Sequence, residues 1–237
     1  NPTGSLVKRI REAQTLTKIE LAIKLLKEAL AKGIAASHVL VDAWFTSPKF
    51  FQAVRHLNLH AIGRLKNDKT CYLYEGKWLS LSQLYHAAKG NLIRDPELGC
   101  PVTALSVTCR NGVEGAIVFV KGYKEPEAET VAGARKNPEL KWAAIFSTDP
   151  TLSAREIVKK YILRWSIEVF FREAKQRLGL GKEQSRCFAA QVSSTTQAFL
   201  RYSILAYLLD KKPADSTIGD MFHQIAQEAG TLTFCDR

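Results

Sequence analysis

The stretch Tyr161-x-x-Arg164-x-x-x-Glu168-x-x-x-x-x-x-Lys175 is the most informative part of this chain, because its four polar residues recur at helical spacing. At about 100° per residue, the last three lie within about 60° of the first around a helix axis. The opposite side of the same helix carries a second polar group, made of Arg155, Lys159, Glu173 and Arg177. An ordinary surface helix has one polar and one apolar face. The row formed by Tyr161, Arg164, Glu168 and Lys175, called here the first stripe, therefore lies where buried packing would be expected. Such a row needs a partner.

The residue types in this stripe suit the chemistry of phosphodiesters. Arg164 can hold a phosphate with its planar guanidinium, Lys175 can supply a point charge, and the Tyr161 hydroxyl can donate a hydrogen bond. Taken as a pair, Arg164 and Glu168 could simply form a helix salt bridge worth about 0.3 kcal/mol. With Tyr161 and Lys175 in the same stripe, the functional interpretation is favoured.

A second carboxylate, Asp42, directly follows a short apolar run at 38–41 that predicts a buried strand. A lone aspartate after a strand is most often a turn residue, although Thr46 or Ser47 is better placed to cap the next helix. Magnesium is usually held by one or two carboxylates together with waters and substrate phosphates. Two such ions about 4 Å apart can activate water for displacement at phosphorus. We therefore expect Asp42 and Glu168 to share divalent metal.

Periodicity along the rest of the chain predicts an α/β fold whose middle third is mostly β. Capping boxes at Thr17 and Ser153 each open a helix. Helices are expected at 18–32, 48–57, 153–178, 191–209 and 218–228. Strands are expected at 38–41, 61–65, 70–74, 77–79, 102–109, 116–120 and 142–147, and an exposed loop at 124–139.

Composition limits the class of protein. The 237 residues are 46% hydrophobic, enough for a sizeable core, and the net charge of +11 with a pI near 9.5 predicts a polyanionic partner such as nucleic acid. The five cysteines form no C-x-x-C pair, and the histidines lie at no metal-ligand spacing. No apolar run approaches a membrane span and the first residues show no signal-peptide pattern, so we expect a cytoplasmic protein.

At these residues the chain resembles the DDE transposases of bacterial insertion sequences. The spacing of Tyr161, Arg164, Glu168 and Lys175 is that of the Tyr-Arg-Glu-Lys signature of the insertion-sequence-four group. The segment 39–45 is similar to the family's strand carrying its second catalytic aspartate, here Asp42. The resemblance covers nearly the whole chain.

The resemblance implies a partial RNase H-like core interrupted by a β-rich insertion. We expect core segments at 1–59 and 149–210, the insertion at 60–148 and a C-terminal tail at 211–237. Asp42 and Glu168 would bind catalytic Mg²⁺, with Mn²⁺ as a possible substitute, while Tyr161, Arg164 and Lys175 would contact double-stranded DNA at transposon ends. By the same resemblance, Trp142 in Leu140-Lys141-Trp142 would support a flipped base. A homodimer in the DNA complex is a further expectation.

One departure from the family pattern is that no aspartate precedes Asp42, whereas the family's first catalytic aspartate lies on an earlier strand. We therefore expect the C-terminal portion of a transposase, inactive by itself. Two alternatives stay open: a non-catalytic DNA-binding remnant, and a metal-dependent nuclease of the same fold that performs no strand transfer.

Overall fold

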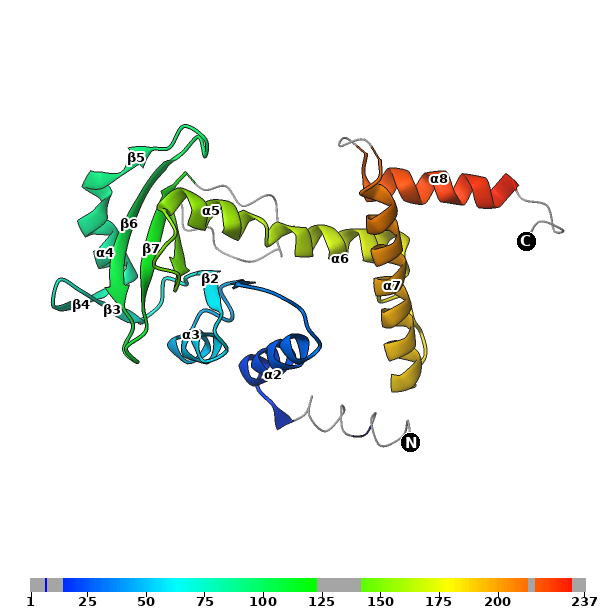
Figure 1. Ribbon diagram of the computed structural model, residues 1–237, viewed down its shortest axis with the longest axis horizontal. Helices are drawn as coiled ribbons and strands as arrows, with labels where there is room; N and C mark the ends of the chain where they lie inside the picture. The colour runs from blue at the N-terminus through cyan, green and yellow to red at the C-terminus, as the bar shows by residue number, and fades with distance from the viewer. Residues whose placement is uncertain (1–6, 8–14, 123–141, 213–215, 232–237) are drawn as a thin grey trace. The chain divides into compact units, whose positions relative to one another are not determined.

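The computed structural model describes residues 7, 15–122, 142–212 and 216–231 (Figure 1). The loop expected at 124–139 lies outside these residues. The chain divides into two compact units, the first ending at Arg164 and the second beginning at Trp165. Each unit is described by itself.

The first unit is built on one mixed sheet of eight strands. Their order is β1-β2-β8-β7-β6-β3-β4, with β5 added alongside β6. Only β1 and β2 pair in parallel, and every other pair of described strands is antiparallel. The strands are β1 (His38–Val41), β2 (His60–Arg64), β3 (Cys71–Tyr74), β4 (Lys77–Ser80), β5 (Ile93–Arg94), β6 (Pro101–Thr108), β7 (Glu114–Lys121) and β8 (Trp142–Ser147).

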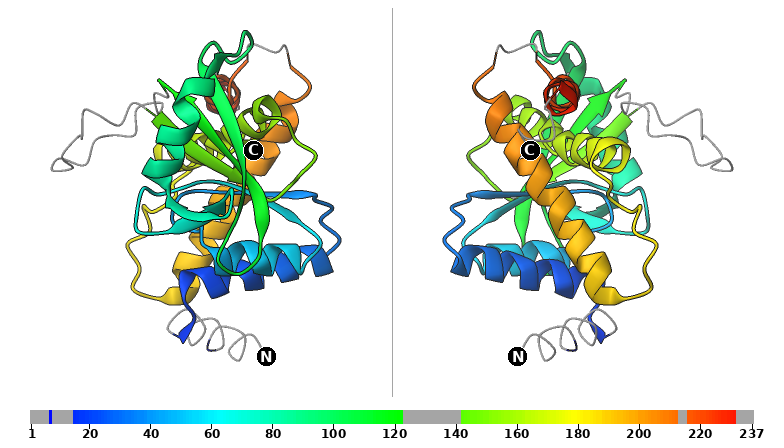
Figure 2. Two further views of the ribbon diagram at one scale, coloured as in Figure 1. Left: turned by 90° about the vertical axis from the view of Figure 1, so that its left-hand side faces the viewer. Right: turned by 90° about the vertical axis from the view of Figure 1, so that its right-hand side faces the viewer.

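Helices cover both faces of this sheet. One face packs against α2 (Lys18–Ala31), α3 (Pro48–Arg55) and α4 (Leu81–Ala88), and its largest buried rings are Phe50, Phe51, Phe119 and Phe146. The other face packs against α5 (Ala154–Ile162) through Ile157, Val158 and Tyr161. Figure 1 shows α4 and α5 on opposite sides of the β6–β7 hairpin, and Figure 2 shows α2 beside α3. The first unit is therefore a three-layer α/β/α arrangement.

Local signals account for most of these elements. The Thr17 and Ser153 capping boxes are both formed, and Ser47 caps α3 with Pro48 in its first turn. Glu75 and Gly76 both have positive φ, 48° and 77°, as a two-residue hairpin turn requires. The expected strands and the helices at 18–32, 48–57, 191–209 and 218–228 are confirmed within a few residues. Three described elements were not predicted: α4, β5 and the short 3-10 helix η1 (Lys89–Asn91). Ser80 and Gln83 nevertheless form a capping box for α4.

The prediction of one continuous helix over 153–178 is wrong. α5 ends at Ile162 and α6 (Trp165–Arg177) begins after a turn at Leu163 and Arg164. In this turn the Leu163 and Arg164 N–H groups donate to the carbonyls three residues earlier, at 3.1 and 3.0 Å. The turn separates Tyr161 and Arg164 from Glu168 and Lys175. The four side chains therefore do not share one face of a single helix.

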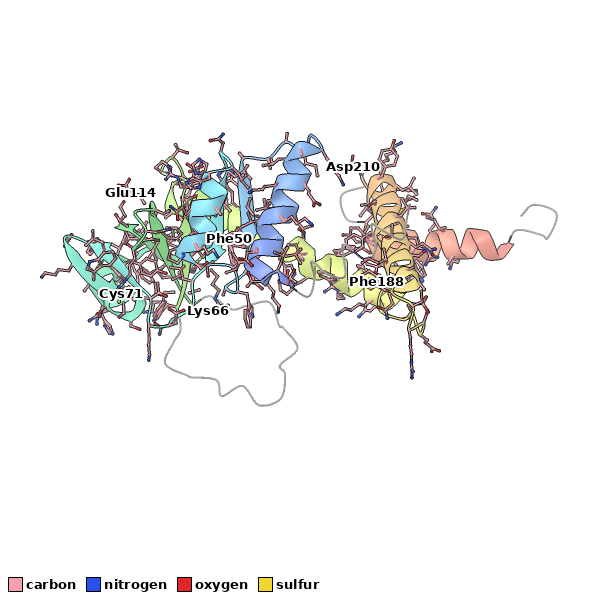
Figure 3. All side chains as sticks on the ribbon, turned by 90° about the horizontal axis from the view of Figure 1, so that it is seen from below. Phe50, Lys66, Cys71, Glu114, Phe188 and Asp210 are labelled. Carbon is pink, nitrogen blue, oxygen red and sulfur yellow. The ribbon has the colours of Figure 1, made fainter. Side chains whose placement is uncertain are left out.

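Among its described residues, the second unit contains α6, α7 (Phe188–Leu209) and α8 (Ile218–Thr231). Phe188 and Asp210 mark the two ends of α7 in Figure 3. The core of this unit is formed by Leu178, Ala198, Leu205, Ile218 and Met221. The buried Glu173 carboxylate accepts hydrogen bonds from Arg177 and Arg172 on its own helix.

The β-rich insertion expected at 60–148 is not seen as a separate body. Its strands join β1 in one sheet, because β2 pairs with both β1 and β8. The boundary between the two compact units, after Arg164, coincides with none of the expected domain boundaries. The four-part division of the chain stays a prediction.

Candidate functional site

Asp42 lies at the carboxyl end of β1, half-buried, in the turn that leads to α3. Its Oδ1 accepts a hydrogen bond of 2.7 Å from the Trp44 backbone N–H, and its carbonyl accepts another from the Phe45 N–H. Its other carboxylate oxygen has no hydrogen-bond or ion-pair partner among the residues that the structure describes. The turn interpretation of Asp42 is thus correct for one of its two carboxylate oxygens.

The turn that carries Asp42 is fixed against β2 by Thr46. The Thr46 hydroxyl lies 3.1 Å from the Ala43 carbonyl and 2.9 Å from the Arg64 carbonyl. Gly63, which pairs with Val41, makes this close approach possible. A Cβ at position 63 would lie 2.5 Å from Thr46 Cγ2 and 2.8 Å from Val41 Cγ2. A glycine within a strand pattern indicates such a close approach, a signal that the sequence analysis did not use.

We expect Gly63→Ala to destabilise the first unit by about 1–3 kcal/mol, because the added methyl overpacks the contact between β2 and the Asp42 turn. Urea unfolding measures the change. The matched control is Gly90→Ala, since no atom lies within 4 Å of a Cβ there. Equal stabilities for the two variants would contradict the packing argument.

Tyr161 is only 4% exposed and belongs to the core on the α5 face of the sheet. The Arg164 guanidinium carbon lies 5.5 Å from the centre of its ring, so the two side chains are in contact across the turn. The structure therefore gives the Tyr161 ring a packing role beneath a half-buried arginine. Direct contact of the Tyr161 hydroxyl with DNA stays a prediction.

Glu168 and Lys175 both lie on α6 and are separated by two helical turns, so they share one face of that helix. Glu168 is half-buried in the first turn, and Lys175 is exposed in the last. The positive end of the helix dipole favours a carboxylate in the first turn. Asp42 belongs to the first unit and Glu168 to the second, and their expected proximity stays a prediction.

Trp142, expected to support a flipped base, begins β8 and is half-buried. Its ring stacks on Tyr85 at 4.6 Å and meets Phe119 edge-on at 5.4 Å. Residues 140 and 141 of its motif lie outside the described part of the chain. Trp44, which the sequence analysis did not single out, is instead 69% exposed. An aromatic residue two positions after a candidate catalytic aspartate is the signal that could have identified it.

His38, His60 and Asp149 form a separate polar cluster that links the start of β1 to the residues just after β8. His38 Nε2 lies 2.8 Å from Asp149 Oδ2, and the His38 and His60 rings are 5.7 Å apart. Burial opposes ionisation of Asp149, but hydrogen bonds from Thr151 and His38 outweigh it and lower the pKa of this carboxyl to about 2. Both carboxylate oxygens already have partners, so we interpret this cluster as structural.

Within the described ranges, no three or more His, Cys, Asp or Glu side chains are grouped as a metal site requires. No helix in the same ranges combines the length and apolar character needed to cross a lipid bilayer.

A sequence model of the family described as "Transposase DDE domain" matches residues 11–209. A comparison with curated proteins found no match.

Proposed function

The chain belongs to the DDE transposase family, and from this membership we propose that it carries the metal-binding and DNA-binding residues of a transposase that cuts the ends of an insertion sequence and joins them to target DNA. Within the family we assign it to the insertion-sequence-four group, on the spacing of Tyr161, Arg164, Glu168 and Lys175. The family implies an RNase H-like fold, and a sheet covered by helices on both faces is consistent with one. Double-stranded DNA is the proposed partner, bound by a homodimer.

The observation that carries this proposal is the Asp42 carboxylate. One of its oxygens is held by the Trp44 N–H, which orients the group, and the other has no partner among the described residues. A fixed carboxylate with an available oxygen is the kind of hard ligand that Mg²⁺ or Mn²⁺ takes. Glu168 offers a second carboxylate in the first turn of α6. Two carboxylates supplemented by waters and substrate phosphates make an adequate donor set for magnesium.

Divalent metal, when bound, would supply an activated water and stabilise the oxygen that leaves phosphorus. Asp42 and Glu168 would hold the metal. Arg164, resting on the Tyr161 ring, would form paired hydrogen bonds to one backbone phosphate, and Lys175 would place an ammonium group on another. These contacts would hold the scissile phosphate so that the attacking oxygen lies opposite the leaving oxygen. The attacking oxygen would come from water in the cutting step and from the freed 3′-hydroxyl in the joining step. Trp142 remains a candidate for contact with DNA bases.

The proposal is tested by nicking of DNA that carries the element's terminal repeats. We expect the full-length protein to nick this DNA with Mg²⁺ or Mn²⁺, and a chelator to remove the activity without removing DNA binding. Nicking that persists in the chelator would contradict the metal site. Binding without nicking in any metal would instead support the non-catalytic remnant.

Lys175→Ala should weaken binding to duplex DNA and reduce its dependence on salt. Each phosphate neutralised contributes about 0.9 to the slope of log affinity against log salt concentration, so we expect the slope to fall by about that amount. The matched control is Lys77→Ala, since Lys77 is also exposed but lies on β4 in the first unit. A slope equal to that of the unmodified protein would argue against a phosphate contact at Lys175.

A further inference from the structure

Trp44 is the most exposed large aromatic side chain in the described part of the chain, with 69% of its surface open to solvent. Its backbone N–H holds the Asp42 carboxylate at 2.7 Å. The turn at 42–45 therefore carries both the proposed metal ligand and, two residues later, an exposed indole ring. A single exposed ring is common on protein surfaces, so the groups around it decide whether it has a binding role.

Two lysines from different elements converge on this ring. The Lys66 ammonium, just beyond the end of β2, lies 4.1 Å from the ring centre, and the Lys18 ammonium, at the start of α2, lies 5.2 Å from it. Both lysines are exposed, and Figure 3 shows where Lys66 lies in the first unit. An exposed ring with two cations close to it suits single-stranded nucleic acid, since bases stack on such a ring and the cations meet phosphates.

We propose that Trp44, Lys18 and Lys66 form a stacking site for an unpaired base of the DNA strand held at Asp42. This inference rests on the proposed function and adds the form of DNA that the site takes. A base inside a duplex is already stacked on both faces. The site therefore selects a strand end or a locally opened step, where an unstacked base is available.

The lysines do not compete with this role. A cation–π contact at an exposed site is weaker than the stacking of a base on tryptophan. The ammonium groups sit on flexible stems and can exchange the ring for the phosphates on either side of the base. The net charge of +11 favours the same partner.

The other tryptophans of the first unit are less suited to this role. Trp142 is already stacked on Tyr85. Trp78 is 47% exposed with the Arg110 guanidinium 5.4 Å from its ring centre, but it lies on β4, at the opposite end of the strand order from β1. Trp78 is thus a matched control: an exposed indole beside a cation, on the same unit, away from Asp42.

The test measures binding of the full-length protein to short oligothymidylate and to duplex DNA of equal length, in chelator so that no strand is cut. Tryptophan fluorescence and anisotropy of labelled DNA are followed together. We expect Trp44→Ala to weaken oligothymidylate binding about tenfold, in line with the loss of one stacked base, and duplex binding less than twofold. Trp44→Phe should keep most of the affinity but lose part of the fluorescence quenching. Trp78→Ala should change neither.

A second variant pair tests the lysines and remains informative if Trp44→Ala fails to fold. Lys18→Ala with Lys66→Ala should lower the salt slope for oligothymidylate by about 1.4, at about 0.7 per phosphate contact on a single strand. Oligothymidylate binding by Trp44→Ala within twofold of the unmodified protein, or an equal loss for single strand and duplex, would overturn the stacking site alone. If the unmodified protein binds neither form of DNA, the proposed function fails with it.

Discussion

Glu168→Gln and Asp42→Asn are each expected to abolish metal-dependent nicking while DNA binding persists. Each substitution keeps the size of the side chain but removes the charge on a hard oxygen ligand, so metal is bound weakly or in the wrong place. We expect nicking to fall by at least about a thousandfold, equivalent to about 4 kcal/mol of transition-state stabilisation. Nicking is measured on terminal-repeat DNA, and binding by mobility shift in chelator. The control is Glu183→Gln, an exposed glutamate of the second unit outside the helices.

The double variant tests whether Asp42 and Glu168 act on the same metal. Groups that serve one site are strongly non-additive, so the double variant should lose no more activity than either single variant. Losses that multiply would indicate two independent roles. If Glu168→Gln nicks DNA as well as the unmodified protein, Glu168 is not a metal ligand.

Phe146→Ala is expected to give the largest loss of stability. Phe146 lies on β8, between β2 and β7, and is fully buried. Its ring lies 4.6 Å from that of Phe51 on α3 and 6.4 Å from that of Tyr72 on β3. Truncation to alanine removes the shared contact between sheet and helix and leaves a cavity, which costs about 3–5 kcal/mol.

Urea unfolding of the full chain measures this loss. Phe146→Leu should cost less, since most of the volume is kept. Ile93→Ala is the matched control, because Ile93 is also a strand residue but is 74% exposed. A loss below about 1 kcal/mol for Phe146→Ala would mean that the centre of the sheet can collapse around the missing ring.

Residues close together in sequence determined the elements that were predicted correctly. The Thr17 and Ser153 capping boxes and the Glu75-Gly76 turn depend on hydrogen bonds and φ values within a few residues. The apolar run at 38–41 and the polar residue that ends it placed Asp42 at the end of a strand in the same way. The sequence was therefore enough to locate one candidate metal ligand.

The helix break at Leu163 and Arg164 could not be predicted from the residues around it. Neither proline nor glycine lies there, and both flanks have helical periodicity. Helical spacing correctly placed Glu168 and Lys175 on one face of α6. The same spacing was wrong when extended back to Tyr161, because the chain turns at Leu163 and Arg164 between the two helices.

By itself, then, the sequence determined the family, the α/β class, most helix and strand positions and the identity of the candidate ligands. Only the tertiary structure decided that Tyr161 is a core residue beneath Arg164, that Gly63 leaves room for the Asp42 turn, and that Trp44 is exposed while Trp142 is stacked. The physical reason is range. Caps and turns form between near neighbours, whereas exposure depends on which distant strands and helices the sheet brings against each side chain.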